Sequence, residues 1–107
     1  MHYYEKAAHG PDASLALEAA RRAAHLAHLD LKKFQKAVDF YRFIIVGSEN
    51  DTERKTSQKA IAQIYFENLL NYDRAIIEFE KLLRLDFTAA EKYQFRLNVA
   101  KSHHQMG

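Results

Sequence analysis

The sequence predicts an all-α fold made of antiparallel helical hairpins, and three observations predict it. Apolar residues recur at the spacing of one helix face, as in the series Ala75, Ile76, Phe79, Leu82 and Leu83. No stretch alternates apolar and polar residues between turn signals, so strands are not expected. Similar residues also recur 38 positions apart along the chain, which indicates a structural repeat.

Composition limits the classes of protein that the chain can belong to. With 107 residues, of which 48% are hydrophobic and 28% charged, it is predicted to form a single domain, 1–107, with a buried core. The net charge of +2 is too small to indicate nucleic-acid binding. The chain has 0 cysteines, which excludes disulfides and thiol chemistry, and no apolar stretch approaches the ~20 residues of a membrane span, so direct membrane insertion is not expected.

The helices are placed by breaks and caps in the sequence. Gly10-Pro11 separates the first two helices, and the Gly47–Asn50 stretch separates the third from the fourth. The fourth carries an apolar stripe that includes Ile61 and Tyr65. Thr88 and Glu91 have the spacing of a capping box at the start of the last helix. The expected helices are 2–9, 13–28, 32–46, 53–69, 72–85 and 89–105.

The 38-residue shift keeps small residues on small ones and aromatic residues on aromatic ones. Ala24, Ala62 and Ala100 form one such series, and Tyr3, Tyr41 and Phe79 form another. Each unit then contains two helices, and hairpins of this kind bury their apolar faces by stacking on neighbours. We expect the alanines where two helices approach closely, the aromatic residues between consecutive hairpins, and His103 partly buried at an aromatic position.

The units resemble the tetratricopeptide repeat, whose pattern includes W-x2-L-G-x2-Y, then A-x3-F, then P. Ile61-Ala62-x2-Tyr65 followed by Ala75-x3-Phe79 is the best match, and the segment from Ala23 to Tyr41 is a looser one. The period of 38 exceeds the family's period of about 34, which indicates lengthened turns. The tryptophan position holds Ala20, Gln58 and Arg96. The resemblance implies a right-handed solenoid of antiparallel hairpins, divided into residues 1–11, 12–50, 51–87 and 88–107.

In this register the sequence begins inside a second helix and stops after a first helix. We therefore expect a fragment of a larger repeat protein, with about two full repeats and a half repeat at each end. Such ends would leave apolar faces that match each other, and they suggest a structural module that assembles weakly head to tail. The residues expected at these faces are Tyr3, Tyr4 and Ala7 at one end and Phe95, Val99 and Ala100 at the other.

The resemblance implies that the first helix of each hairpin lines a concave, peptide-binding groove. Residues beside the packing stripe are Arg21, His25 and His28 in one unit, Lys59, Gln63 and Phe66 in the next, and Leu97, Lys101 and His104 in the third. None of these nine residues is acidic, although nine surface positions can also lack acids by chance. The sequence therefore favours a protein or peptide partner, with an acidic segment preferred.

Two more specific functions receive less support from the sequence. Family members that bind chaperones clamp a peptide carboxylate with Lys and Asn side chains, but the corresponding places here hold Arg21, His25, Ala60, Gln94 and Asn98. His25 and His28 have a spacing that could hold a metal, yet no third ligand accompanies them, so no metal or cofactor is expected. No nucleophile stands beside a base, and the chain is not expected to be an enzyme.

Overall fold

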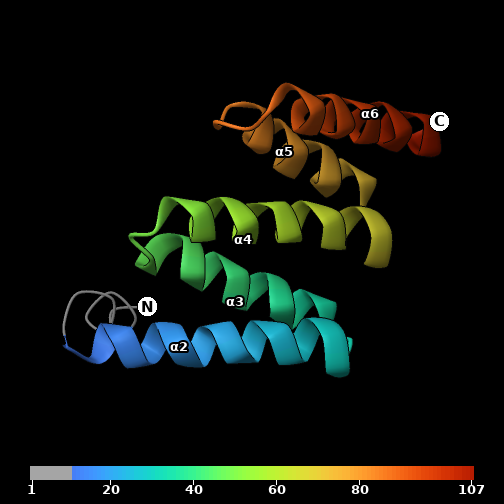
Figure 1. Cartoon of the computed structure of the whole chain (residues 1–107). Helices are drawn as coiled ribbons and strands as arrows, with labels where there is room; N and C mark the ends of the chain where they lie inside the picture. Colours follow the sequence, from blue (N-terminus) through green and yellow to red (C-terminus); the bar gives the residue numbers. More distant parts are fainter. Residues whose placement is uncertain (1–10) are drawn as a thin grey trace. The chain divides into compact units, whose positions relative to one another are not determined.

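The computed structural model describes residues 11–107, and in this range the chain is all helical, without strands. Two α-helices continue into short π-helical segments, η1 and η2 (Figure 1). The elements are α2 (Pro11–His25), η1 (Leu26–Asp30), α3 (Phe34–Gly47), α4 (Asp51–Gln63), η2 (Ile64–Asn68), α5 (Tyr72–Leu83) and α6 (Ala89–Met106).

The all-α prediction is confirmed for these residues, and most helix ends shift by only one or two residues. The helix expected at 13–28 is α2 together with η1, and the helix expected at 53–69 is α4 together with η2. The helix expected at 2–9 lies outside the described residues. α4 begins at Asp51 because Asn50 caps it, its side-chain oxygen accepting a hydrogen bond from the Glu53 amide at 2.9 Å.

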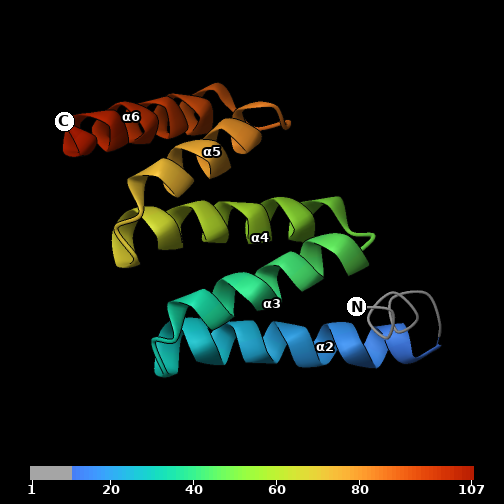
Figure 2. The ribbon, with the colours of Figure 1, turned by 180° about the vertical axis from the view of Figure 1, so that it is seen from behind.

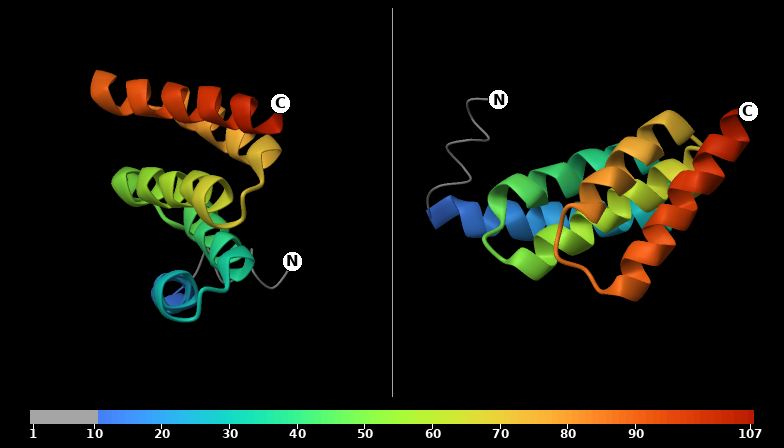
Figure 3. Two further views of the ribbon diagram at one scale, coloured as in Figure 1. Left: turned by 90° about the vertical axis from the view of Figure 1, so that its right-hand side faces the viewer. Right: turned by 90° about the horizontal axis from the view of Figure 1, so that it is seen from above.

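By packing, the chain divides into two compact units, Met1–Ser57 and Gln58–Gly107, so the division falls inside α4. In unit 1, α2 packs on α3, and the two helices run in opposite directions (Figures 1 and 2). In unit 2, α5 packs on α6 in the same antiparallel manner, which Figure 3 shows from two further sides.

Unit 1 has a core in which small residues let α2 and α3 approach closely. Ala20 and Ala24 of α2 form a buried cluster with Ile44 of α3, and Phe40 and Tyr41 pack against it. A stripe of alanines on α2 thus faces larger side chains on α3. This alternation of small and large residues fills the space between helices at close range.

The core of unit 2 is more aromatic. Phe79 of α5 is fully buried and its ring centroid lies 5.9 Å from that of Phe66 and 6.0 Å from that of Phe95 in α6. Phe87, before α6, meets Phe95 edge to face at 5.1 Å. Phe79 of α5 therefore contacts both η2, through Phe66, and α6, through Phe95.

The turns after η1 and η2 have the same backbone structure. The Leu31 amide donates to the Leu26 carbonyl at 2.9 Å, and the Leu69 amide donates to the Ile64 carbonyl at 2.9 Å. The next residues, Lys32 and Leu70, have left-handed φ angles of 52° and 51°. A left-handed residue ends a helix, and here it does so without the glycine or asparagine that usually occupies this conformation.

The predicted capping box at the start of α6 is confirmed. The Glu91 amide donates to the Thr88 hydroxyl at 3.1 Å, and the Thr88 amide donates to the Glu91 carboxylate at 3.2 Å. Asn50 and Glu53 occupy the matching positions at the start of α4. Each of these helices therefore begins with a cap followed, three residues later, by a glutamate.

Candidate functional site

The described part of unit 1 contains an open hollow of about 500 Å³, which we call the Arg21 hollow. Side chains from α2, from α3 and from the first two turns of α4 surround it. Its wall combines apolar surface with hydroxyl, amide and charged groups. Its lining residues are Arg21, Tyr41, Ile44, Asn50, Thr52, Glu53, Thr56 and Ser57.

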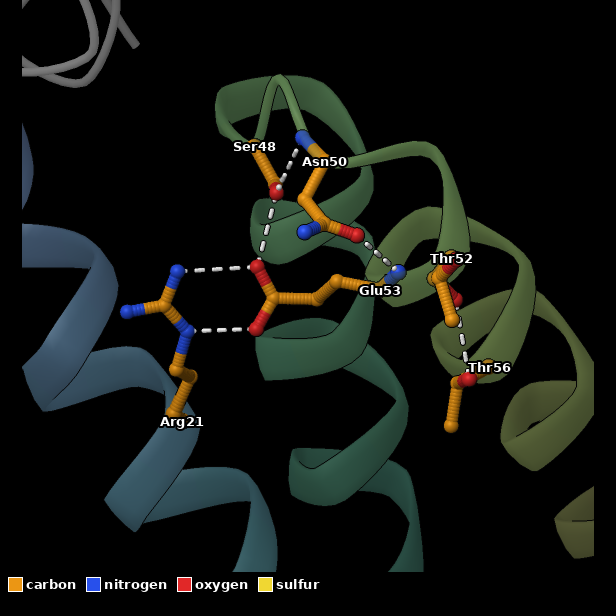
Figure 4. A network of polar contacts seen from close by, with 6 residues as sticks. All are labelled: Arg21, Ser48, Asn50, Thr52, Glu53 and Thr56. Carbon is orange, nitrogen blue, oxygen red and sulfur yellow. Dashed lines mark hydrogen bonds and ion pairs between the residues drawn. The ribbon is translucent and has the colours of Figure 1, made fainter.

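An ion pair joins α2 to α4 at this hollow (Figure 4). The guanidinium of Arg21 donates from Nη2 to Glu53 Oε1 at 2.8 Å and from Nε to Glu53 Oε2, which makes the contact bidentate. The hydrogen bond from Arg21 lowers the pKa of the Glu53 carboxyl, and the Ser48 hydroxyl acts in the same direction. Glu53 in turn raises the pKa of Arg21.

The loop before α4 fixes the position of the Glu53 carboxylate. The hydroxyl of Ser48, a buried residue, donates to Glu53 Oε1 at 2.7 Å and accepts from the Asn50 amide at 3.1 Å (Figure 4). The Asn50 side chain caps the helix at the Glu53 amide. Backbone and side chain of Glu53 are thus both held, and the carboxylate is presented to α2 in a defined geometry.

Neutral hydroxyl groups complete the wall of the hollow. Tyr41 is half-buried, burial raises the pKa of its phenol, and its oxygen lies 3.0 Å from His28 Nδ1. Thr56 donates to the backbone carbonyl of Thr52 at 2.8 Å, which leaves its hydroxyl oxygen able to accept. The Arg21 hollow therefore offers hydrogen-bonding groups beside an ion pair that is already formed.

A second ion pair in unit 2 has the same arrangement. Lys59 Nζ of α4 lies 3.5 Å from Glu91 Oε2 in α6, and both side chains are 37% exposed. The backbone N–H of Thr88 and its hydroxyl lower the pKa of Glu91, and Lys59 adds to this effect. Lys59 and Glu91 each lie 38 residues after Arg21 and Glu53, so the two ion pairs occupy matching positions.

His28 and Phe66 belong to matching aromatic clusters and are half-buried. The His28 ring meets Phe34 and Tyr41 edge to face, at centroid distances of 6.2 Å and 5.9 Å. The Phe66 ring meets Tyr72 and Phe79 in the same way, at 6.0 Å and 5.9 Å. Both residues thus pack against the helix that follows in their own unit.

The remaining residues predicted for the groove lie at or near the surface. His25, Lys101 and His104 are exposed, Leu97 is 36% exposed, and Gln63 is half-buried. Among residues 11–107, no hydrogen bond joins Gln63, Lys101 or His104 to another predicted groove residue. Arg21 and Lys59 each face a glutamate, so the predicted surface does not carry an unopposed positive charge at these two positions.

The ion pairs of Glu53 and Glu91 were not predicted from the sequence, which identified Glu91 only as part of the capping box. The predicted groove residues lie on one face of each first helix, and both glutamates lie in a first turn outside that face. A usable signal was present, since Arg21 and Glu53 are 32 residues apart and Lys59 and Glu91 have the same separation.

Two predictions about the last helix are wrong. Phe95 was expected on an exposed face, but it is 2% exposed because it packs on Phe79 and Phe87. His103, expected to be partly buried at an aromatic position, is exposed because no helix covers its side of α6 within residues 11–107. Ala100 was expected both in a close helix contact and at the end face, and it is exposed. Val99 is half-buried, and the other end face, with Tyr3, Tyr4 and Ala7, lies outside the described residues.

A buried carboxylate in α5 was also missed. Glu78 is fully buried and accepts a hydrogen bond from Gln58 Nε2 of α4 at 2.8 Å. Arg74 Nε and Lys81 Nζ, both on α5, lie 3.2 Å and 3.5 Å from its Oε2 atom. The positive charges compensate the buried carboxylate, while the amide of Gln58 ties it to the neighbouring helix.

No metal site is formed by the part of the chain that the structure describes. Across residues 11–107, no three His, Cys, Asp or Glu side chains lie close enough together to hold a metal ion. His25 is exposed, whereas His28 is directed to Tyr41. Within the same range, every helix is too short or too polar to cross a membrane.

Units 1 and 2 therefore share an ion pair, an aromatic cluster and a turn at positions that are 38 residues apart, and unit 1 has an open hollow at its ion pair. Comparison with protein-family models, with curated proteins and with solved structures gives no match.

Proposed function

We propose that this chain is a tetratricopeptide-like helical-repeat module that binds a protein or peptide segment, with the Arg21 hollow as a contact site. The observation that carries the proposal is the recurrence of three independent features at one spacing. Repeated hairpins of this kind stack into right-handed solenoids whose surfaces recognise other proteins. Catalysis and cofactor binding are not part of the proposal.

The turn, the aromatic cluster and the ion pair support the repeat in different ways. The turns match in hydrogen bonds and in left-handed φ angles, although Lys32 and Leu70 differ in chemistry. The aromatic clusters match in distance although His28 stands where Phe66 does. Equal geometry from different residues favours a common backbone plan over chance similarity of sequence.

The lining of the Arg21 hollow indicates what kind of segment would bind there. Its volume is within the range of about 300–1,000 Å³ found for ligand sites, but it is open, and its wall combines apolar surface with polar groups. Because Arg21 already pairs with Glu53, a ligand carboxylate would have to compete for the guanidinium. Hydroxyls of Tyr41 and Thr56 are better placed to bind the backbone or a neutral polar side chain of an extended segment.

A displayed library of random peptides, selected on the whole chain, tests this proposal. Selected peptides should shift the amide NMR signals of Arg21, Thr52 and Thr56 more than those of unit 2. The variant Thr52→Trp places a large ring at the hollow and should weaken binding about tenfold or more. Its matched control is Ala90→Trp, at the equivalent exposed position of α6, which should change affinity by no more than about twofold.

Two results would count against this function. A library that yields no binding peptide would remove the proposal as a whole. Peptides that bind equally well to Thr52→Trp would remove the Arg21 hollow as their contact site. Self-assembly through open repeat ends is the alternative use of such a module, and light scattering at several concentrations distinguishes it, because only self-assembly raises the mass with concentration.

A further inference from the structure

One face of α6 has no helix packed on it within the described residues, although the matching faces of the earlier helices are covered. In α2 and η1, the residues of this face are Ala20, Ala24 and Ala27, which are at most 6% exposed beside α3. In α4 and η2, they are Gln58, Ala62 and Tyr65, which are at most 8% exposed. Gln58 hydrogen-bonds to Glu78 of α5, and Arg74 of α5 lies over the Tyr65 ring at 6.0 Å.

In α6, the same face consists of Arg96, Ala100 and His103, with Val99 beside them, and we call it the Arg96 face. Arg96, Ala100 and His103 are exposed and Val99 is half-buried. α6 packs on α5 (Figure 3). The side of α6 that carries Phe95 makes this contact, and the Arg96 face is uncovered in the described part of unit 2.

The first residue of each covered face matches, in its chemistry, the residue that it contacts on the covering helix. Ala20 in α2 lies in an apolar cluster with Phe40 of α3. Gln58 in α4 donates to the carboxylate of Glu78 in α5, and Glu78 lies 38 residues after Phe40. In the first pair, Ala20 and Phe40, both residues are apolar. In the second pair, a polar residue, Gln58, contacts an acidic one, Glu78.

Arg96 continues this series with a positive charge. Within residues 11–107 it makes no ion pair, and Lys92 lies one turn before it on α6. A guanidinium at the position of Gln58 is complementary to a carboxylate at the position of Glu78. The apolar pair Val99 and Ala100 adds a surface on which only a helix with a small residue at the contact can approach closely.

We propose that the Arg96 face of α6 binds an amphipathic α-helix of another protein that carries a carboxylate opposite Arg96. The helices that cover α2 and α4 indicate the rest of its pattern. Both place a fully buried alanine three residues before the matching position, Ala37 and Ala75, and a buried aliphatic residue four residues after it, Ile44 and Leu82. The partner helix is therefore expected to contain the sequence pattern Ala-x-x-acid-aromatic-x-x-Leu, or the same pattern with Ile at the last position. This surface shares no residue with the Arg21 hollow.

The natural probes for this face are peptides with the sequences of the two covering helices. Residues 71–85 supply the acidic version, with Glu78, and residues 33–47 supply the apolar version, with Phe40. Short helices are only marginally stable alone, so each peptide carries a hydrocarbon bridge across one turn, at positions 73 and 77 or at positions 35 and 39. These four positions are exposed in α5 and α3.

Fluorescence anisotropy with the whole chain should show that the acidic peptide binds and that the variant Arg96→Glu weakens this binding about tenfold. Peptide Glu78→Arg should restore binding to Arg96→Glu, because the charges are exchanged. The apolar peptide should be nearly insensitive to Arg96→Glu. The control variant Arg84→Glu changes the same charge at an exposed position outside the face, and should alter affinity by no more than about twofold.

The proposal is overturned if the acidic peptide fails to bind at millimolar concentration, or if its affinity is the same for Arg96→Glu and wild type. It is also overturned if the chain alone forms a dimer that Arg96→Glu dissociates, since a second copy would then occupy the face. Amide NMR shifts confined to Val99, Ala100 and His103 on addition of the acidic peptide would support the assigned surface. Shifts confined to α4 would instead indicate displacement of the chain's own α5.

Discussion

Glu53 shows how one residue can take part in the structure of two helices, through its backbone amide and its carboxylate. Its amide is capped by Asn50 at the start of α4, and its carboxylate reaches Arg21 on α2. Glu91 repeats this arrangement with Thr88 and Lys59 in unit 2. A glutamate three residues after a helix cap therefore has a structural role in both units, and it also reduces the positive field of the basic residue that it pairs with.

The first prediction concerns the pH dependence of stability. Because the folded-state pKa of Glu53 is lowered, its contribution is present above the pKa of the unfolded chain and is lost as the pH falls through the folded value. Arg21→Ala should therefore cost at most about 1 kcal/mol at pH 7, since the pair is partly exposed, and less at pH 3. Urea denaturation at both pH values measures this difference.

A double-mutant cycle provides the control for this pair. Glu53→Gln should remove the same pH-dependent contribution, and Arg21→Ala should then add little to it. An equal loss of stability at pH 3 and pH 7 in Arg21→Ala would show that the pair does not act through the ionised carboxylate.

The second prediction concerns the close contact at Ala62. This residue is 0% exposed, so Ala62→Leu should overpack the core of unit 2 and destabilise it by about 1–3 kcal/mol. Ala100→Leu is the matched control, because Ala100 occupies the equivalent position on α6 and is exposed, and it should change stability by less than about 0.5 kcal/mol. Similar melting temperatures for the two variants would contradict the assigned register.

At the scale of elements, the turns after η1 and η2 place residues other than glycine or asparagine in the left-handed conformation. Lys32 and Leu70 adopt left-handed conformations that cost about 1–2 kcal/mol for a residue with a Cβ atom. Other residues of the turn compensate this cost, including backbone hydrogen bonds from Lys33 to Ala27 at 2.7 Å and from Asn71 to Tyr65 at 2.9 Å.

The third prediction follows from this conformation. Lys32→Gly relieves the left-handed strain and should raise the free energy of unfolding by about 0.5–1 kcal/mol, after the added entropy of the unfolded chain is subtracted. Leu31→Gly is the control in the same turn, since Leu31 is also exposed but has a right-handed φ of −92°, and it should destabilise. If both variants are destabilised alike, the turn does not have the left-handed geometry described here.

The positions of the helices were more predictable from the sequence than the contacts between them, because helix signals are local and contacts are not. Apolar periodicity and the cap at Thr88 located α5 and α6 because these signals are local. The left-handed turns were not predictable, because neither Lys32 nor Leu70 is a residue type that marks such a turn. The packing of His28 on Phe34 and Tyr41 was also not predictable, because both residues lie on the helix that follows. Which side of a helix is covered depends on its neighbours, and the period of the pattern does not determine it.

At the scale of the whole molecule, the matching features of the chain lie at positions that are 38 residues apart. The turns, the aromatic clusters and the ion pairs all follow this spacing, and the start of α6 at Ala89 follows the start of α4 at Asp51. In a protein of repeated hairpins, stability is approximately the sum of repeat and neighbour contributions. Adding one 38-residue repeat in register should therefore extend the structure and raise its free energy of unfolding.

Tandem duplication of residues 51–88 tests this equivalence most directly. The inserted copy carries α4, η2 and α5, and places its last residue, Thr88, before α6 as in the original chain. The control inserts a copy of residues 53–88, which is two residues shorter and changes the register of the helix that follows. In urea denaturation followed by circular dichroism, the in-register variant should unfold cooperatively, with a higher midpoint and a larger m-value than the original chain, and the control should unfold at lower urea. An in-register variant that is no more stable than the control would contradict the repeat.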